Sequence, residues 1–284
     1  MKKKLNKYLS VIILTFNESV HIKRCIENVK KLTDNIFIVD SFSDDKTYQL
    51  AKKYKIKFIK RKFKNHSDQL NWSIKKLNLK TPWIMRLDAD EYLEKKLIDE
   101  IKKKIPYLSN DINGVILKRK HIFLNKWIKY GGRYPLFMLR IWRNGFALVE
   151  KKWMDEHIVL KKGKSKIFSN YFVDHNLKGL SHFIQKHNKY ADNEVIDIIN
   201  LKKKYKNKIK LDEKNISKRK IKNKIYLNLP FFIGPLAYFI YRYLFRFGFL
   251  DGVKGFIYHF LQGFWYRFLI DCKLLENKIN KKDN

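Results

Sequence analysis

The fold is decided by the stretch Trp83-Ile84-Met85-Arg86-Leu87-Asp88-Ala89-Asp90-Glu91. It begins with a mostly apolar run, which predicts a short buried strand. The carboxylates that follow would lie at the carboxyl end of this strand, where open α/β sheets bind their ligands. Because residues two apart in an extended chain point to the same side, Asp88 and Asp90 can converge on one point.

Two converging carboxylates repel each other, and each raises the pKa of the other. The pair is therefore costly unless a divalent cation or strong hydrogen-bond donors lie beside it, and a metal-bound diphosphate would suit it. The alternative is that Asp88 and Asp90 are solvated acids at the amino end of a helix that the pattern predicts from near Leu93. An Asp-x-Asp pattern alone does not decide between these interpretations.

The composition indicates a folded protein that binds an anionic partner. The chain has 284 residues, of which 45% are hydrophobic and 15% aromatic, so it can form a sizeable core. Its 63 Lys and Arg residues outnumber 27 Asp and Glu residues, for a net charge of +36. An anionic membrane face, a phosphorylated substrate or a nucleic acid would each match this charge.

Cysteine usage and the amino-terminal sequence indicate a cytoplasmic location. Cys25 and Cys272 have no metal-ligand spacing and predict neither a zinc site nor a disulfide framework. The amino-terminal segment shows no signal-peptide pattern.

Strand patterns alternate with helical patterns through the first hundred or so residues. Strands are predicted at 8–16, 36–39, 56–59 and 83–87, with a helix between each pair. This alternation predicts a mostly parallel α/β sheet with right-handed crossovers, so Asn17, Asp40 and Asp88 should lie at the same sheet edge. The sequence has neither a Gly-x-Gly-x-x-Gly fingerprint nor a P-loop, which argues against dinucleotide-binding and P-loop folds.

A second group of polar residues lies beyond a helix predicted at 93–105. Strands are predicted at 114–117, 135–142 and 146–149, and Asp155 and Glu156 follow them. These acids could supply a general base or form an exposed acidic turn. His175 lies among polar residues before a helix predicted over 180–198, and its imidazole could reach a metal or a phosphate.

The last third of the chain is basic and then aromatic. Residues 201–228 form a Lys-rich linker, and residues 229–284 combine aromatic and apolar residues with scattered Arg and Lys. The apolar run 229–241 is shorter than the roughly 20 residues of a membrane-spanning helix. We therefore expect helices that lie in a membrane interface, with burial in a protein core as the alternative.

Three motifs together resemble family 2 of the glycosyltransferases, which has the GT-A fold. They are Leu9–Glu18, which is similar to the family's first strand and nucleotide-contacting loop, Phe37–Thr47, in which Phe42 replaces a common glycine, and Asp88–Asp90. The resemblance implies a Rossmann-like, mostly parallel sheet flanked by helices, followed here by a helical, aromatic-rich extension.

The resemblance also implies roles for individual residues. Asn17, Glu18 and Asp40 would contact the nucleotide base and ribose, Asp88 the ribose or the metal, and Asp90 the divalent ion, Mg²⁺ or Mn²⁺. Other candidates are Thr15 and Arg86 for the nucleotide sugar and His175 for the metal.

The resemblance extends to the lipopolysaccharide-core glucosyltransferase branch of the family. Members of this branch carry a His-Glu pair where this chain has Asp155 and Glu156, so Glu156 aligns as the base and Asp155 replaces the histidine. The segment 241–252 also resembles this branch, whose members act at the cytoplasmic membrane face.

The resemblance implies inverting transfer of a sugar from a nucleotide-sugar donor to a saccharide or glycolipid acceptor. The pathway would be cell-envelope polysaccharide biosynthesis: lipopolysaccharide core, lipooligosaccharide or capsule. We expect a GT-A domain at 1–200, with a donor half at 1–110 and an acceptor half at 111–200, then a linker at 201–228 and a membrane-associating extension at 229–284. The expected partner surface is the anionic inner membrane, and no nucleic acid is expected.

Two alternatives remain. A polyprenyl-phosphate glycosyltransferase would share the donor half but need no general base, because its nucleophile is a phosphate. A non-enzymatic membrane or nucleic-acid binder would use the basic surface and have no need of Asp88 or Asp90.

Overall fold

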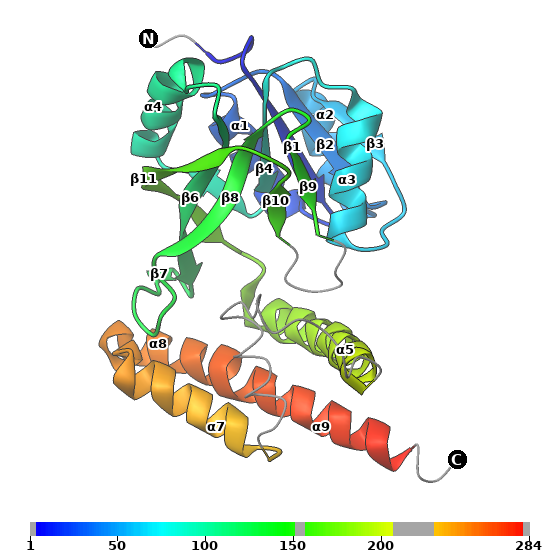
Figure 1. Ribbon diagram of the computed structural model, residues 1–284, viewed down its shortest axis with the longest axis vertical. Helices are drawn as coiled ribbons and strands as arrows, with labels where there is room; N and C mark the ends of the chain where they lie inside the picture. Colours follow the sequence, from blue (N-terminus) through cyan, green and yellow to red (C-terminus); the bar gives the residue numbers. More distant parts are fainter. Residues whose placement is uncertain (1–3, 151–156, 207–229, 281–284) are drawn as a thin grey trace. The chain divides into compact units, whose positions relative to one another are not determined.

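The computed structural model describes residues 4–150, 157–206 and 230–280 of the chain (Figure 1). The chain divides into two compact units. The first contains residues 1–129 and 133–179, and the second contains residues 130–132 and 180–284. The main division between the units falls between residues 179 and 180.

The first unit starts with the predicted alternation of strands and helices. The parallel strands β1, β2 and β4 pair with β1 in the centre, and β3 extends the sheet beyond β2. The strands are β1 (Leu9–Thr15), β2 (Ile36–Asp40), β3 (Lys57–Lys60) and β4 (Trp83–Asp88), and the helices between them are α1 (Ser19–Val29), α2 (Thr47–Lys53) and α3 (His66–Leu77).

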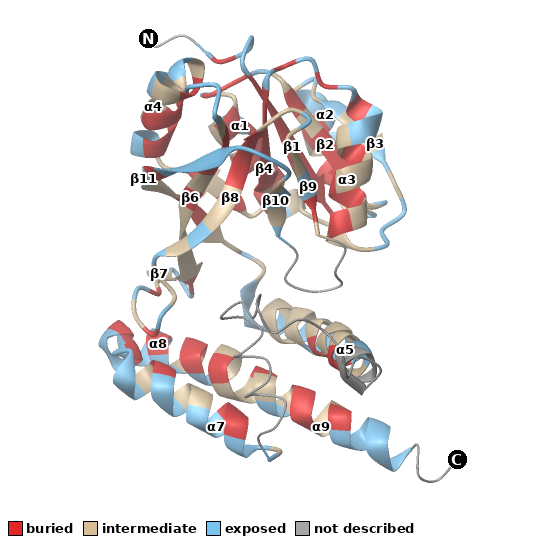
Figure 2. Ribbon diagram, viewed as in Figure 1, coloured by how far each residue is buried: buried red, intermediate tan, exposed pale blue. Residues whose placement is uncertain are grey.

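Both faces of this sheet are buried, which explains why β1 is apolar along nearly its whole length (Figure 2). On one face, Val11 and Ile13 of β1 belong to a core cluster that contains Ile22 and Ile26 of α1. On the other face, Ile12 belongs to a cluster that includes residues of α3. Alternate residues of one strand thus enter two separate cores, as the pleat of a β-strand requires.

The second half of the first unit continues the same sheet with mixed strand directions. The full order is β3-β2-β1-β4-β8-β6-β11-β5, in which β8 is antiparallel to β4 and β6, and β11 is parallel to β6. Its elements are β5 (Glu91–Leu93), α4 (Lys95–Lys104), the 3₁₀ turn η1 (Ile105–Tyr107), β6 (Ile112–Phe123), β7 (Lys126–Trp127), β8 (Leu136–Arg143), β9 (Ala147–Val149), β10 (Ile158–Leu160) and β11 (Lys164–His175).

Strand β5 overturns one interpretation of the acidic pair. The helix expected from near Leu93 begins two residues later, at Lys95, because residues 91–93 pair with β11 as a strand. The residue at the N-cap of α4 is Glu94. Asp88 therefore ends β4 and Asp90 lies in the turn before β5, so neither residue caps a helix.

Glu100 on α4 holds this helix against an irregularity in β11. The register between β6 and β11 shifts between Ile167 and Tyr171. Within this irregularity, the backbone N–H groups of Ser169 and Asn170 each donate to the Glu100 carboxylate over 3.0 Å. Burial alone would raise the pKa of Glu100, but hydrogen bonds from Lys104 and from these N–H groups lower it to about 2.

Glu100→Gln is expected to lower the free energy of unfolding by about 2–3 kcal/mol at pH 7, because two backbone donors lose an ionised acceptor. The folded pKa lies below the unfolded value, so this stabilisation is complete above the ordinary pKa of 4.5 and disappears as the pH falls through about 2. Urea denaturation at pH 7, 5, 4 and 3 should show the difference from the wild type shrinking with pH. A difference that does not change with pH would contradict this role, and Glu276→Gln on the exposed part of α9 is the matched control.

The second unit is helical. It contains α5 (Gly179–Lys206), α7 (Ile233–Ile240), the π-helical turn η3 (Tyr241–Phe245), the 3₁₀ turn η4 (Gly248–Asp251), α8 (Gly252–His259), the π-helical turn η5 (Phe260–Trp265) and α9 (Tyr266–Ile279). Ala191 and Val195 of α5 form a core with Tyr266 and Ile270 of α9, which is why α5 belongs to this unit. Within the described residues, no helix combines the length and the apolar character needed to cross a membrane.

Candidate active site

The carboxyl ends of β1, β2 and β4 meet at one edge of the sheet, as the alternation of strands and helices predicts. Thr15 is in register with Asp40 on β2, and Leu14 is in register with Asp88 on β4. Open α/β sheets bind their ligands outside this edge. The structure therefore places Asn17, Asp40 and Asp88, which follow or end these three strands, at the same edge of the sheet.

Asp40 fastens the loops after β1 and β2 to each other. Its carboxylate is fully buried and accepts hydrogen bonds from the Thr15 hydroxyl at 2.8 Å and from the Ser43 backbone and hydroxyl at 2.8 and 2.6 Å. Asn17 has a positive φ of 54° and donates its backbone N–H to the Ser43 hydroxyl. These contacts fix the two loops in which a nucleotide was expected to bind.

Asp88 is balanced by two arginines. Arg86 Nε donates to its Oδ1 over 3.1 Å, and Arg140 Nη2 lies 3.6 Å from its Oδ2. Burial alone would raise the pKa of Asp88, but the charges of Arg86 and Arg140 outweigh this and hold the pKa well below its usual range. The strong donors that the acidic pair requires are thus supplied, for Asp88, by the protein itself.

Arg140 also binds Glu91, a residue that the sequence analysis did not assign to the site. Glu91 and Arg140 are 2% and 3% exposed, and their side chains form a buried ion pair. Burial raises the pKa of Glu91, and the neighbouring Arg140 charge opposes this effect. The other Glu91 oxygen accepts the Asp88 backbone N–H at 2.9 Å, so Glu91 closes the turn between Asp88 and β5.

Asp90 is half-buried and is held by α1, by the last residue of β11 and by the residue after it. Its carboxylate accepts a hydrogen bond from the Asn176 amide at 3.0 Å. Its backbone carbonyl accepts from Arg24 Nη2 at 2.9 Å and from the His175 backbone at 3.1 Å. Arg24 is on α1, so the turn is held from two other elements.

Residues 176–178 form what we call the strap, in which each residue contacts the site. Beyond Asn176, the Leu177 N–H donates to His21 Nε2 at 2.7 Å, and Lys178 Nζ lies 2.8 Å from Glu18 Oε1. Since His21 Nε2 accepts this hydrogen bond, the ring proton is on Nδ1, which faces Glu18 Oε2 at 2.5 Å. Burial would raise the pKa of Glu18, but its hydrogen bonds with His21 and Lys178 lower it.

His175 lies beside the strap with both ring nitrogens in contact with other groups. Nδ1 is 3.5 Å from Arg24 Nη1, and Nε2 is 3.1 Å from Asn125 Oδ1. Burial and the Arg24 charge lower the pKa of His175. To bind a metal the ring would have to give up one of these contacts, so the role of metal ligand remains a prediction that this geometry does not favour.

Comparison with known proteins assigns a family to the part of the chain that contains β1, β2 and β4. The sequence model of the family described as "Glycosyl transferase family 2" matches residues 10–149. These residues are a family 2 glycosyltransferase domain. The family resemblance inferred from the motifs is thus confirmed.

Two bacterial relatives agree with this assignment. An uncharacterized glycosyltransferase of Rickettsia conorii is 26% identical over 294 residues, covering 100% of this chain and 95% of the relative. The lipopolysaccharide core biosynthesis glycosyltransferase LpsC of Rhizobium meliloti is 30% identical over 117 residues. The second match covers 39% of this chain and 42% of LpsC.

A solved structure shows the same fold. The mannosyltransferase PcManGT from Pyrobaculum calidifontis, in complex with GDP-Man and Mn²⁺, matches 96% of this chain and 88% of its own with a TM-score of 0.55. Its sequence identity is 13%, so the likeness concerns the fold alone. The expected GT-A fold is confirmed.

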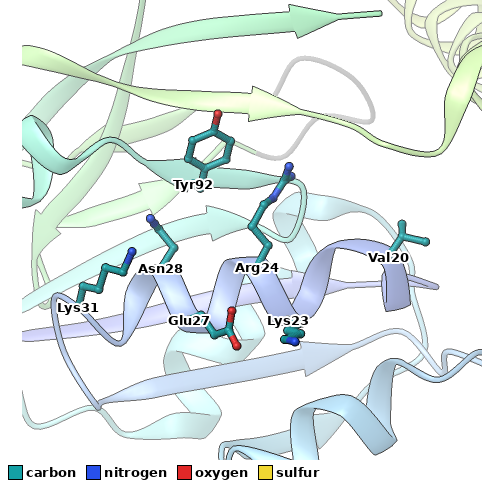
Figure 3. A pocket seen from close by; sticks show the side chains of 7 residues that line it. All are labelled: Val20, Lys23, Arg24, Glu27, Asn28, Lys31 and Tyr92. Atoms are coloured by element: carbon teal, nitrogen blue, oxygen red, sulfur yellow. The ribbon is translucent and has the colours of Figure 1, made fainter. Parts of the chain in front are cut away.

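A surface pocket is lined mainly by residues of α1 (Figure 3). None of the site residues predicted from the sequence lines it. Its lining includes Arg24, whose guanidinium is 5.0 Å from the ring of Tyr92 on β5. The full lining is Val20, Lys23, Arg24, Glu27, Asn28, Lys31 and Tyr92.

The two candidate bases, Asp155 and Glu156, lie outside the described residues. The strands on either side of them are described, and Ile158 of β10 pairs with Val149 of β9. Asn71 of α3 donates to the Val149 carbonyl at 3.1 Å and accepts from its N–H at 3.2 Å. Val149 and Ile158, the described strand residues on either side of Asp155 and Glu156, are therefore linked to each other, and Val149 is also linked to α3.

Proposed function

We propose that this glycosyltransferase moves a sugar from a nucleotide-sugar donor to a saccharide or glycolipid acceptor of a cell-envelope polysaccharide, at the anionic inner face of the cytoplasmic membrane. One observation carries the proposal: Asp88 at the end of β4 and Asp90 in the turn after it lie at the ligand-binding edge of the sheet. We assign Asp90 to a cation, because its half-buried carboxylate lies just after the end of β4. The similarity to LpsC supports the acceptor class.

The donor would lie over the loops that Asp40 fastens together. In this proposal Thr15 and Asp40 keep the loops in place, Asn17 and Glu18 contact the base and ribose, and Arg86 orients Asp88 toward the ribose. Such prior fixing of loops reduces the conformational entropy that binding would otherwise cost.

Asp90, with Asp88 beside it, would hold Mg²⁺ or Mn²⁺. Mg²⁺ is usually held by one or two carboxylates together with substrate phosphates, and the hard oxygen ligands here fit such a site. Among the described residues, no group of three or more His, Cys, Asp and Glu side chains forms a ready-made metal site. A site completed by the donor's diphosphate would need no such group. When bound, the ion would offset the charge of the departing diphosphate.

In the proposed reaction Glu156 takes the proton from the acceptor hydroxyl, with Asp155 as the alternative base. The hydroxyl oxygen attacks the anomeric carbon on the face opposite the diphosphate. The bond between this carbon and the diphosphate oxygen breaks as the new bond forms, so the configuration at the carbon inverts.

The test is the thermal stability of the protein with a panel of UDP-, GDP-, CMP- and dTDP-sugars, each with and without Mn²⁺. A ligand at one hundred times its Kd stabilises the folded state by about 2.7 kcal/mol, so the true donor should raise Tm by several degrees in the presence of Mn²⁺. Mn²⁺ alone is the control. If no nucleotide sugar changes Tm, the proposed donor class is wrong.

A further inference from the structure

The segment from η3 to η5 buries mainly small and polar residues, together with the aromatic ring of Tyr258. The charged side chains of Arg242 and Asp251 are only 2% exposed, and the titratable side chain of His259 is fully buried. Glycines are buried beside them at positions 248, 255 and 263. A water-soluble helical bundle normally buries large apolar side chains instead.

The polar groups inside these helices bind one another and the segment 130–132. Arg242 Nε donates to the Gly131 carbonyl at 3.0 Å, and Arg242 Nη2 lies 3.1 Å from His259 Nδ1. Asp251 accepts the backbone N–H of Tyr130 at 3.0 Å. Because these buried groups are hydrogen-bonded, they do not destabilise the interior as unpaired groups would.

The glycines allow the elements to approach closely. A methyl group at Gly255 would lie 2.2 Å from Asp251 Cβ, and one at Gly248 would lie 2.8 Å from His259 Cδ2. Small residues at helix contacts and polar residues turned inward are typical of helices whose surroundings are apolar.

The outside of the segment from η3 to the start of α8 is mostly apolar. Between η3 and the start of α8, Leu244, Phe245, Phe247, Phe249, Leu250 and Val253 are 53%, 70%, 57%, 43%, 52% and 77% exposed. Their rings are contiguous, since Phe249 lies 6.2 Å from Phe247 and 6.3 Å from Tyr243. We call residues 244–253 the apolar tip. A soluble monomer rarely exposes so many large apolar side chains together, and such a patch marks a binding surface.

We propose that the apolar tip inserts into the interfacial layer of an anionic lipid bilayer. Basic side chains accompany it, because Arg246 within the tip and Lys254 next to it are both exposed. The chain's net charge of +36 has the sign that anionic headgroups attract. No described helix is suited to crossing the bilayer, so the insertion is shallow.

The choice of an anionic membrane rests on the proposed function, but its test measures lipid binding and not sugar transfer. Full-length protein is sedimented with vesicles of phosphatidylcholine containing 30% phosphatidylglycerol, and with vesicles of phosphatidylcholine alone, in low and high salt. The wild type should bind the anionic vesicles, and salt should weaken this binding without abolishing it, because the apolar contribution is not screened.

Two variants separate the apolar and the electrostatic contributions. Phe245→Ser with Val253→Ser should lower the high-salt partition coefficient by about tenfold or more, since two large apolar side chains no longer insert. Arg246→Gln with Lys254→Gln should weaken binding only at low salt. Tyr107→Ser, at a residue of the first unit that is 86% exposed, is the matched control and should bind like the wild type. Circular dichroism and Tm should show that all the variants are folded.

Three outcomes would overturn the proposal. The first is wild-type protein that stays in the supernatant with anionic vesicles at low salt. The second is a Phe245→Ser, Val253→Ser variant that binds as tightly as the wild type in high salt. The third is a wild-type dimer in size-exclusion chromatography that this double variant dissociates, without any vesicle binding, because the tip would then be a contact between two copies of the chain.

Discussion

Asp90→Ala is expected to lower kcat/KM for sugar transfer by about 10³-fold or more and to remove the Mn²⁺ dependence of donor binding. The reason is that Asp90, just after the carboxyl end of β4, is the residue that we propose as the carboxylate ligand of the cation. Offsetting the charge of a leaving diphosphate contributes several kcal/mol to stabilisation of the transition state, which corresponds to such a factor. Initial rates and calorimetric titration with the nucleotide sugar, with and without Mn²⁺, measure both effects.

The fold should survive this substitution. Asp90 is half-buried in a turn that Arg24 and His175 hold through the backbone carbonyl, which the substitution keeps. Asp111→Asn, at an exposed position before β6, is the matched control and should transfer at the wild-type rate. If the Asp90→Ala protein still binds the donor in a Mn²⁺-dependent way, the metal is held elsewhere.

Glu156→Gln is expected to lower kcat by about 10²- to 10⁴-fold while leaving donor affinity nearly unchanged. Glutamine keeps the shape of the side chain but cannot take a proton from the acceptor hydroxyl. Steady-state kinetics with saturating acceptor, together with a donor Kd from titration, separate catalysis from binding.

Asp155→Asn is the companion measurement for this prediction. If Asp155→Asn shows the loss of kcat and Glu156→Gln does not, the base is one residue earlier. If neither substitution affects kcat, the reaction needs no base, which favours the polyprenyl-phosphate glycosyltransferase because a phosphate nucleophile is already ionised.

The sequence was sufficient to predict the first half of the fold because both faces of its sheet are buried. Strands such as β1 then consist of continuous apolar residues, and each is followed by a helix and by polar residues at the sheet edge. The strand β5 was not predicted. Its three residues have no pattern of their own, and they become a strand only because β11 pairs with them.

The sequence predicted the acidic residues of the candidate site but not the residues that contact them. Arg140, about fifty residues along the chain from Asp88, reaches it because β8 is inserted beside β4, which no local pattern reveals. One signal was available: Arg140 is the single charged residue in the run 136–142, and a charge in a buried strand needs a partner. The strap, which contacts Asp90, Glu18 and His21 from residues 176–178, had no such signal.

The segment 130–132 limits how this protein can be divided or recombined. The chain enters the second unit at residue 130, leaves it after residue 132 and returns at residue 180. Arg242 and Asp251 hold this inserted segment through its backbone, and a side chain at Gly131 would meet the His259 ring at 2.1 Å. A chimaera that takes residues 180–284 from a relative must therefore take that relative's counterpart of residues 130–132 as well, so the two segments are expected to be inherited as one module.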